Sequence, residues 1–160
     1  MVNKIHIFGG PGSGKTTLAT KLSEELNIHH YDLDKIRYKE EDEDYRLTED
    51  EKIRDEKLKK ILSKKKWITE GSYTNFARPC FEKAEKIIFL EPSMLVTNYR
   101  IIKRLILHKL GIKKLPKKQR WGSLAEIIRW NYTFNYQRLP KLKERLKPIR
   151  HKIIIVNTDK

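Results

Sequence analysis

One short segment constrains this chain more than any other: Gly9-Gly10-Pro11-Gly12-Ser13-Gly14-Lys15-Thr16, which fits the pattern G-x-x-x-x-G-K-[ST] in full. An apolar run, Lys4–Phe8, comes before it, and a helical pattern from Lys15 to Leu26 follows. Glycines let the backbone turn its amide N–H groups toward an anion, and the positive end of the helix points at the same anion. The segment therefore predicts a phosphate-binding loop.

The parts of this loop have separate predicted roles with a nucleoside triphosphate. Lys15 is expected to contact the β- and γ-phosphates, and the Thr16 hydroxyl is expected to bind Mg²⁺. ATP and Mg²⁺ are therefore the predicted cofactors. A GTPase is not favoured, because no glycine has an aspartate three residues before it. The predicted nucleotide-binding residues are Gly9, Gly10, Pro11, Gly12, Ser13, Gly14, Lys15, Thr16 and Thr17.

Apolar runs and helical patterns alternate along the 160 residues, which indicates an α/β fold with a parallel sheet covered on both faces. We expect one domain over 1–160, with a charged insert at about 35–66 and a basic region at about 100–122. Thr48 and Glu51 form a predicted capping box for a helix in the insert. The expected strands are Lys4–Phe8, His29–Asp32, Trp67–Glu70, Lys86–Leu90 and Lys152–Val156. The other expected helices are Lys15–Leu26, Met94–Leu110, Ser123–Arg138 and Pro140–Leu146.

The net charge of +15 lies in one part of the chain. Residues 100–152 hold 17 Lys and Arg against two acidic residues, Glu126 and Glu144, while basic and acidic residues balance elsewhere. An anionic partner, including nucleic acid bound weakly, would meet the protein there, although a solvated basic surface is an equal alternative. Late aromatic residues could stack on nucleic acid, but helical core is the favoured interpretation. They are Trp121, Trp130, Tyr132, Phe134 and Tyr136.

The single cysteine, Cys80, cannot form an internal disulfide and is interpreted as a buried small residue. The first residues show no secretory leader, and no apolar run is long enough to span a bilayer. A cytoplasmic protein with no membrane partner is expected. The sequence does not indicate an oligomeric state.

Four further segments stand out: Asp34-Lys35-Ile36-Arg37, Trp67–Tyr73, Phe89-Leu90-Glu91-Pro92 and Arg100-Ile101-Ile102-Lys103-Arg104. Together with the phosphate-binding loop, they resemble the adenylate kinase family, and most closely its relatives, the DNA topology modulation proteins of the FlaR-like group. Glu70 departs from the aspartate of that family. The resemblance implies a three-layer P-loop fold like that of the nucleoside monophosphate kinases, with strand order 2-3-1-4-5 and a helical lid.

The resemblance also implies roles for individual residues. Glu70 would bind Mg²⁺ with Thr16, and Asp34 would be a general base or an acceptor ligand, with a helix N-cap as the alternative. Arg100 and Arg104, on one helix face, would act with Lys15 on the transferring phosphoryl group. The implied acceptor-binding residues are Asp32, Arg37 and Arg78. The implied lid residues are Arg120 and Arg129, with the tract from Lys113 to Arg120 as the lid itself.

These roles together predict a kinase that transfers the γ-phosphoryl group of Mg-ATP to a small acceptor resembling a nucleotide or nucleoside. Two alternatives remain open at this point. One is an ATP-dependent regulator associated with nucleic acid, and the other is a simple ATPase.

Overall fold

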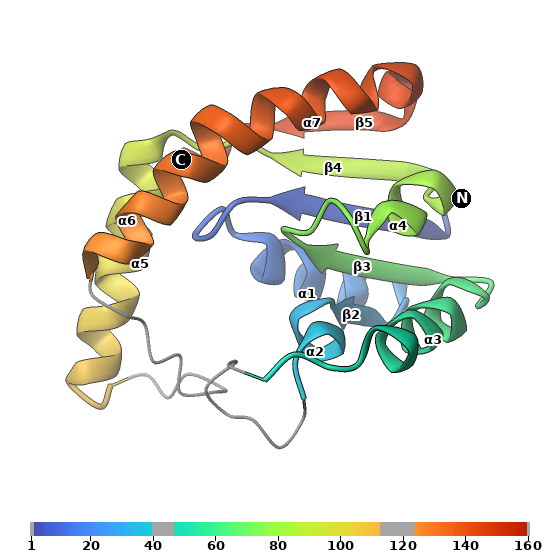
Figure 1. Ribbon diagram of the computed structural model, residues 1–160, viewed down its shortest axis with the longest axis horizontal. Coiled ribbons are helices and arrows are strands. Elements are labelled where there is room, and N and C mark those ends of the chain that lie inside the picture. Colours follow the sequence, from blue (N-terminus) through green and yellow to red (C-terminus); the bar gives the residue numbers. More distant parts are fainter. Residues whose placement is uncertain (1, 40–46, 113–123, 160) are drawn as a thin grey trace.

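The computed structural model describes residues 2–39, 47–112 and 124–159. Its five strands form one parallel sheet in the order β2-β3-β1-β4-β5, as Figure 1 shows, which confirms the predicted fold class and strand order. The strands are β1 (Lys4–Gly9), β2 (His30–Asp32), β3 (Trp67–Gly71), β4 (Lys86–Leu90) and β5 (Ile153–Val156). Each begins and ends within one residue of its predicted bounds.

The helices connect these parallel strands. Three of them come before β3: α1 (Lys15–Leu26), the short α2 (Asp34–Arg37) and α3 (Glu51–Leu62). The six-residue α4 (Arg78–Lys83) lies between β3 and β4 and was not predicted. The remaining helices are α5 (Met94–Lys109), α6 (Leu124–Thr133), the π-helix η1 (Phe134–Arg138), α7 (Leu139–Leu146) and the 3₁₀ segment η2 (Lys147–Lys152).

The two faces of the sheet pack against different helices. Alternate residues of β1 point to opposite faces, so Ile5 and Ile7 pack on the side of α1 while Phe8 packs on the side of α3, α4 and α7. All three side chains are almost fully buried. The helices α5 and α6 stand beyond the carboxyl ends of the strands (Figure 1). There the buried Asn131 amide of α6 donates to Thr97 Oγ1 of α5 at 2.8 Å.

The cap of α3 differs from the prediction. The Asp50 carboxylate, and not Thr48, accepts hydrogen bonds from the amides of Lys52 and Ile53 at 2.9 and 3.4 Å. The predicted capping box is therefore wrong. Thr48 instead forms an antiparallel bridge with Tyr38. Two good N-cap residues lie two positions apart here, and the backbone pairing of Thr48 leaves Asp50 to cap the helix.

A polar pair is buried in the middle of the sheet. His6 Nδ1 of β1 lies 2.9 Å from Thr69 Oγ1 of β3, its neighbour in register, and both residues are fully buried. Burial lowers the pKa of His6 to about 3, although its contact with Thr69 acts in the other direction. Cys80 is buried in the same layer, and burial raises the pKa of its thiol to about 12. This cysteine is not suited to act as a nucleophile.

None of the helices in the described ranges is long and apolar enough to cross a membrane.

Candidate active site

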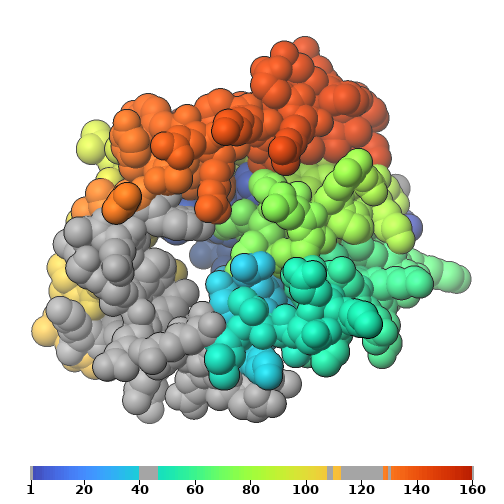
Figure 2. Space-filling model, viewed as in Figure 1, coloured from blue at the N-terminus to red at the C-terminus, as the bar shows by residue number. Residues whose placement is uncertain are grey.

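The loop predicted to bind phosphate joins β1 to α1 at the carboxyl edge of the sheet. Figure 2 shows a hollow at this edge, with part of the N-terminal segment, in blue, at its floor. Gly12 and Gly14 have φ angles of 70° and 92°, in the left-handed region that favours glycine. A Cβ atom on Gly10 would lie only 3.0 Å from the ring of Phe134, so η1 packs directly against the loop.

Side chains from the loop itself and from distant parts of the chain bind the carbonyl groups of this loop. Ser72 Oγ donates to the Gly9 carbonyl at 2.7 Å, and Lys15 Nζ donates to the Gly10 carbonyl at 2.9 Å. Thr158 Oγ1, beyond β5, donates to the Ser13 carbonyl at 3.2 Å. Carbonyls that are bound in this way do not point at a phosphate, which leaves the loop amides to do so.

Lys15 is surrounded by charged groups. Desolvation lowers the pKa of its amine, while the carboxylates of Glu70, Asp34 and Asp32 act to raise it and the guanidinium of Arg104 acts to lower it. Arg104 is therefore close enough to Lys15 for their charges to interact. Desolvation lowers the pKa of Arg104 as well. Both cations are thus partly removed from water.

Thr16 and Glu70 meet beside the loop. Thr16 Oγ1 donates to Glu70 Oε1 at 2.7 Å, and Glu70 is 3% exposed at the end of β3. Burial raises the pKa of Glu70, while Lys15 and Thr16 act to lower it. A hydroxyl and a carboxylate oxygen are the donors that Mg²⁺ prefers. The described residues hold no group of three or more His, Cys, Asp and Glu placed to bind a metal. An ion at Thr16 and Glu70 would therefore also need nucleotide oxygens or water.

Two further carboxylates lie next to Glu70. Asp32 is its neighbour in the register of β2 and β3, and burial, followed by the charges of Asp34 and Glu70, raises the pKa of Asp32 to about 6. Asp32 Oδ1 accepts a hydrogen bond from the Asp34 amide at 2.8 Å. Asp34 is the first residue of α2, whose N-cap is Leu33, so the alternative N-cap role of Asp34 is not observed.

Tyr73 was not singled out by the sequence analysis, yet it contacts two of the predicted residues. Its hydroxyl donates a short hydrogen bond to Asp34 Oδ1, and burial, with the Asp34 charge, raises the pKa of Tyr73 far above its ordinary value. Arg37 lies over the Tyr73 ring at 5.1 Å and near the ring of Phe76 at 5.9 Å. Arg54 lies 4.9 Å from the same Phe76 ring. The position of Tyr73 two residues after Gly71 was visible in the sequence, but its partner was not.

The remaining predicted arginines are dispersed. Arg100 donates to Thr158, through Nη1 to the hydroxyl at 3.1 Å and through Nη2 to the carbonyl. Arg78 is 79% exposed and pairs with Glu82 at 2.8 Å, so it does not join the residues around Lys15. Arg129 is exposed on α6. Arg120 and the tract from Lys113 to Arg120 lie outside the described residues.

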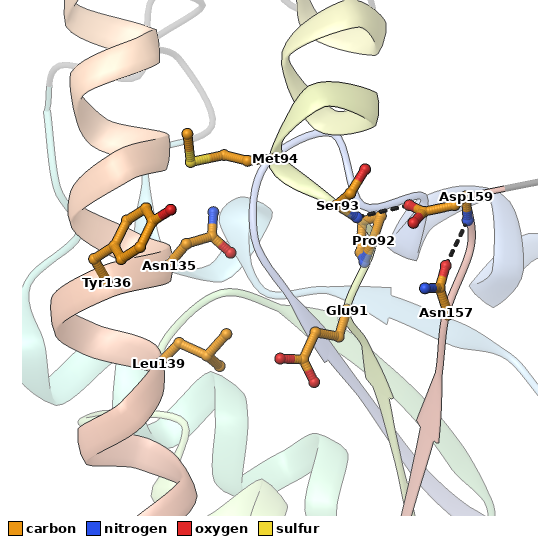
Figure 3. Close-up of a pocket in the computed structure, with 9 residues that line it drawn as sticks. All are labelled: Glu91, Pro92, Ser93, Met94, Asn135, Tyr136, Leu139, Asn157 and Asp159. Atoms are coloured by element: carbon orange, nitrogen blue, oxygen red, sulfur yellow. Dashed lines mark hydrogen bonds between the residues drawn. The ribbon is translucent and has the colours of Figure 1, made fainter.

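A pocket of about 320 Å³ lies next to the residues that follow β5. Figure 3 shows it between Glu91, Pro92, Ser93 and Met94 on one side and Asn135, Tyr136 and Leu139 on the other. Asn157 and Asp159 complete its lining. None of the P-loop residues lines it, and neither does Glu70. The pocket is therefore separate from the Lys15 site.

Comparison with known families places this geometry in context. A family model described as an AAA domain matches residues 8–105, more than half of the chain. The chain belongs to this AAA-domain family. The matched part of the AAA domain runs from β1 into α5 and so contains the P-loop, Glu70 and both Arg100 and Arg104. No curated protein matches the sequence.

Solved structures extend the likeness of this AAA domain to its fold. A shikimate kinase from Bacteroides thetaiotaomicron matches with a TM-score of 0.56 and 18% identity, over 99% of this chain and 88% of the other. A gluconokinase from Sinorhizobium meliloti 1021 matches with a TM-score of 0.48 and 16% identity, over 89% of this chain and 97% of the other. The first match shows a P-loop, kinase-like fold, and the second is too distant to support an inference.

Proposed function

We propose that this protein is a P-loop kinase that transfers the γ-phosphoryl group of Mg-ATP to a small acceptor. The observation that carries the proposal is the hydrogen bond of 2.7 Å between Thr16 and Glu70, next to Lys15 and the P-loop. It puts the oxygen donors for a metal beside the amides and the amine that would hold phosphate. The likeness in fold to a shikimate kinase supports a kinase, although not a particular acceptor.

The residues of the site divide the work of this reaction. The loop amides would bind the phosphates, and Lys15 would exchange its bond to the Gly10 carbonyl for bonds to the β- and γ-phosphates. Thr16 and Glu70 would hold Mg²⁺, which supplies positive charge against the phosphate oxygens. Arg104, whose charge interacts with that of Lys15, would stabilise the transferring phosphoryl group.

The acceptor would bind on the side of β2 and α2. Asp32 and Asp34 stand there at the edge of the sheet, and Arg37 lies over the Tyr73 ring. A carboxylate close to the phosphoryl group can accept the proton of an acceptor hydroxyl. Arg37 can bind an anionic group of the acceptor, because a guanidinium group offers several N–H donors.

A coupled assay of ATP consumption tests the proposal. The purified protein is incubated with Mg-ATP and with nucleosides, nucleoside monophosphates or small alcohols, and ADP release is followed. We expect turnover that depends on one class of acceptor and that Lys15→Ala abolishes. The variant should still fold, because Lys15 is only partly buried and leaves no apolar cavity. Circular dichroism of the variant is the control.

Two results would contradict the proposal. Turnover without any acceptor would indicate a simple ATPase, and turnover stimulated only by DNA or RNA would indicate a nucleic-acid-dependent enzyme. The comparisons give no support to a nucleic-acid partner, so the proposal assigns no nucleic-acid-binding role to the basic residues of 100–152.

A further inference from the structure

The residues after β5 reach back to the P-loop at a single peptide group. Thr158 Oγ1 donates to the Ser13 carbonyl at 3.2 Å, across 145 positions of the sequence. The same hydroxyl accepts from Arg100 Nη1 at 3.1 Å, and Arg100 Nη2 donates to the Thr158 carbonyl. The Thr158 hydroxyl is therefore part of a chain of hydrogen bonds. This chain runs from α5 through the residues after β5, 157–159, here called the tail, to the P-loop.

Arg100 determines the direction of this chain. A threonine hydroxyl has one hydrogen to donate, and a guanidinium group can only donate. Because Arg100 donates to Thr158 Oγ1, the hydroxyl hydrogen is directed at the Ser13 carbonyl. Hydrogen bonds in series also strengthen one another. Substituting Arg100 should thus weaken the hydrogen bond between Thr158 and Ser13 although no residue of the P-loop is changed.

The Ser13 carbonyl belongs to the same planar peptide group as the Gly14 amide. In a trans peptide these two groups point in opposite directions. Holding the carbonyl against Thr158 therefore turns the Gly14 N–H away from the tail and toward the inside of the loop. Gly14 has a φ angle of 92°, and apart from its chain neighbours no heavy atom lies within 4 Å of where a Cβ would be. A glycine in open space offers little resistance to rotation of this peptide group.

The tail itself is anchored independently of the loop. The Asp159 carboxylate accepts a hydrogen bond from the Ser93 amide at 2.6 Å, and the Asp159 amide donates to Asn157 Oδ1 at 2.8 Å, as Figure 3 shows. Ser93 directly precedes α5, the helix that carries Arg100. The residue after Thr158 is thus bound to the start of α5, and this contact does not involve the P-loop.

We infer that Thr158 is a positioning residue, directed by Arg100, that locks the peptide group between Ser13 and Gly14 so that the Gly14 N–H faces the phosphates. This inference rests on the proposed function, because it assigns a purpose to the loop in binding ATP. It also gives Arg100 a different task from Arg104: Arg100 acts through Thr158, while Arg104 acts beside Lys15.

The test compares Thr158→Val, which removes only the hydroxyl, with Thr158→Ser, which keeps it. Calorimetry with Mg-ATP should show about 3- to 10-fold weaker binding for Thr158→Val, the loss expected for one hydrogen bond, and near wild-type binding for Thr158→Ser. Arg100→Ala should weaken binding similarly, and the double variant should lose little more than either single variant. Thr20→Val is the matched control, because the exposed Thr20 hydroxyl also donates to a backbone carbonyl, within α1.

A measurement without nucleotide separates this inference from the proposed function. NMR relaxation dispersion of the Gly14 amide should detect exchange on the microsecond-to-millisecond scale in Thr158→Val, and none in the wild type or in Thr158→Ser. If the wild type fails to bind Mg-ATP while Thr158→Val shows this exchange, the proposed function is wrong, and the positioning of the Ser13–Gly14 peptide group by Thr158 is supported. If Thr158→Val shows no added exchange and binds Mg-ATP like the wild type, Thr158 does not position this peptide group and the inference is wrong. Additive losses in the double variant would likewise remove the link through Arg100.

Discussion

The buried His6 should make the stability of the protein depend on pH in a measurable way. Its pKa is about 3 in the folded protein, against 6.5 for an exposed histidine. Between these values the unfolded chain binds a proton that the folded chain does not, so acid favours unfolding. Each pH unit in this range changes the free energy of unfolding by about 1.4 kcal/mol. Between pH 7.5 and pH 5 the expected loss is about 2 kcal/mol.

Asp32 opposes this effect in the wild type. Its pKa rises from 3.8 to about 6 on folding, so between these values the folded protein holds a proton that the unfolded chain has lost. The contribution of Asp32 to stability therefore increases as pH falls through 6. The two slopes have opposite signs from about pH 4 to pH 6. In the wild type the two contributions to the free energy of unfolding therefore partly cancel in this range. The contribution of His6 is isolated by comparing the wild type with a variant that lacks only this histidine.

The perturbation is therefore His6→Gln, which keeps a polar group near Thr69 and removes the titration. Urea unfolding followed by circular dichroism gives the free energy of unfolding of both proteins at several pH values. The substitution shifts the stability by a constant amount. In addition to this constant difference, the free energy of unfolding of the variant should rise by about 2 kcal/mol relative to that of the wild type as the pH falls from 7.5 to 5.

The control for this experiment is His151→Gln, since His151 is an exposed histidine of η2. Its profile should run parallel to that of the wild type. If the His6→Gln profile also runs parallel to the wild type, His6 does not stay neutral when buried, and the reasoning from its burial is refuted.

Three further predictions concern the site. Glu70→Gln should raise the Mg²⁺ concentration needed for half-maximal turnover; a change confined to the apparent affinity for the acceptor would assign Glu70 to the acceptor instead. Arg104→Ala should lower kcat by about 10²-fold with little change in ATP affinity, as stopped-flow kinetics and calorimetry would show, and an equal loss in ATP affinity would contradict its role in the transition state. Tyr73→Phe should free Asp34 from its hydrogen bond and alter the KM for the acceptor more than that for ATP; steady-state kinetics that show the reverse would place Asp34 at the nucleotide.

Local patterns predicted the parts of this molecule that depend on neighbours in sequence. The buried strands are short apolar runs because both faces of the sheet are covered, and the P-loop needs glycines at fixed positions. The helix α1 was predicted with its observed bounds, Lys15–Leu26. The proximity of Thr16 and Glu70 followed from the family resemblance and not from the pattern.

Contacts between residues that are distant in the sequence could not be predicted from such patterns. Nothing near Thr158 in the sequence indicates that its hydroxyl reaches Ser13, because the order of the strands brings the end of β5 to the P-loop. The pairing of Tyr73 with Asp34 likewise depends on the pairing of β2 with β3, because these two residues follow the carboxyl ends of the two strands. The choice of Asp50 over Thr48 as N-cap depends on the bridge between Thr48 and Tyr38.

The central position of β1 also affects the order in which the protein can assemble during its synthesis. A ribosome makes β1 first, yet the two strands that pair with it, β3 and β4, are made about 60 and 80 residues later. The hydroxyl that holds the Ser13 carbonyl comes later still, at residue 158. A nascent chain that already contains the whole P-loop motif therefore lacks the groups that shape it. Affinity for ATP should therefore appear late in synthesis, after β3 and β4 have paired with β1 on its two sides.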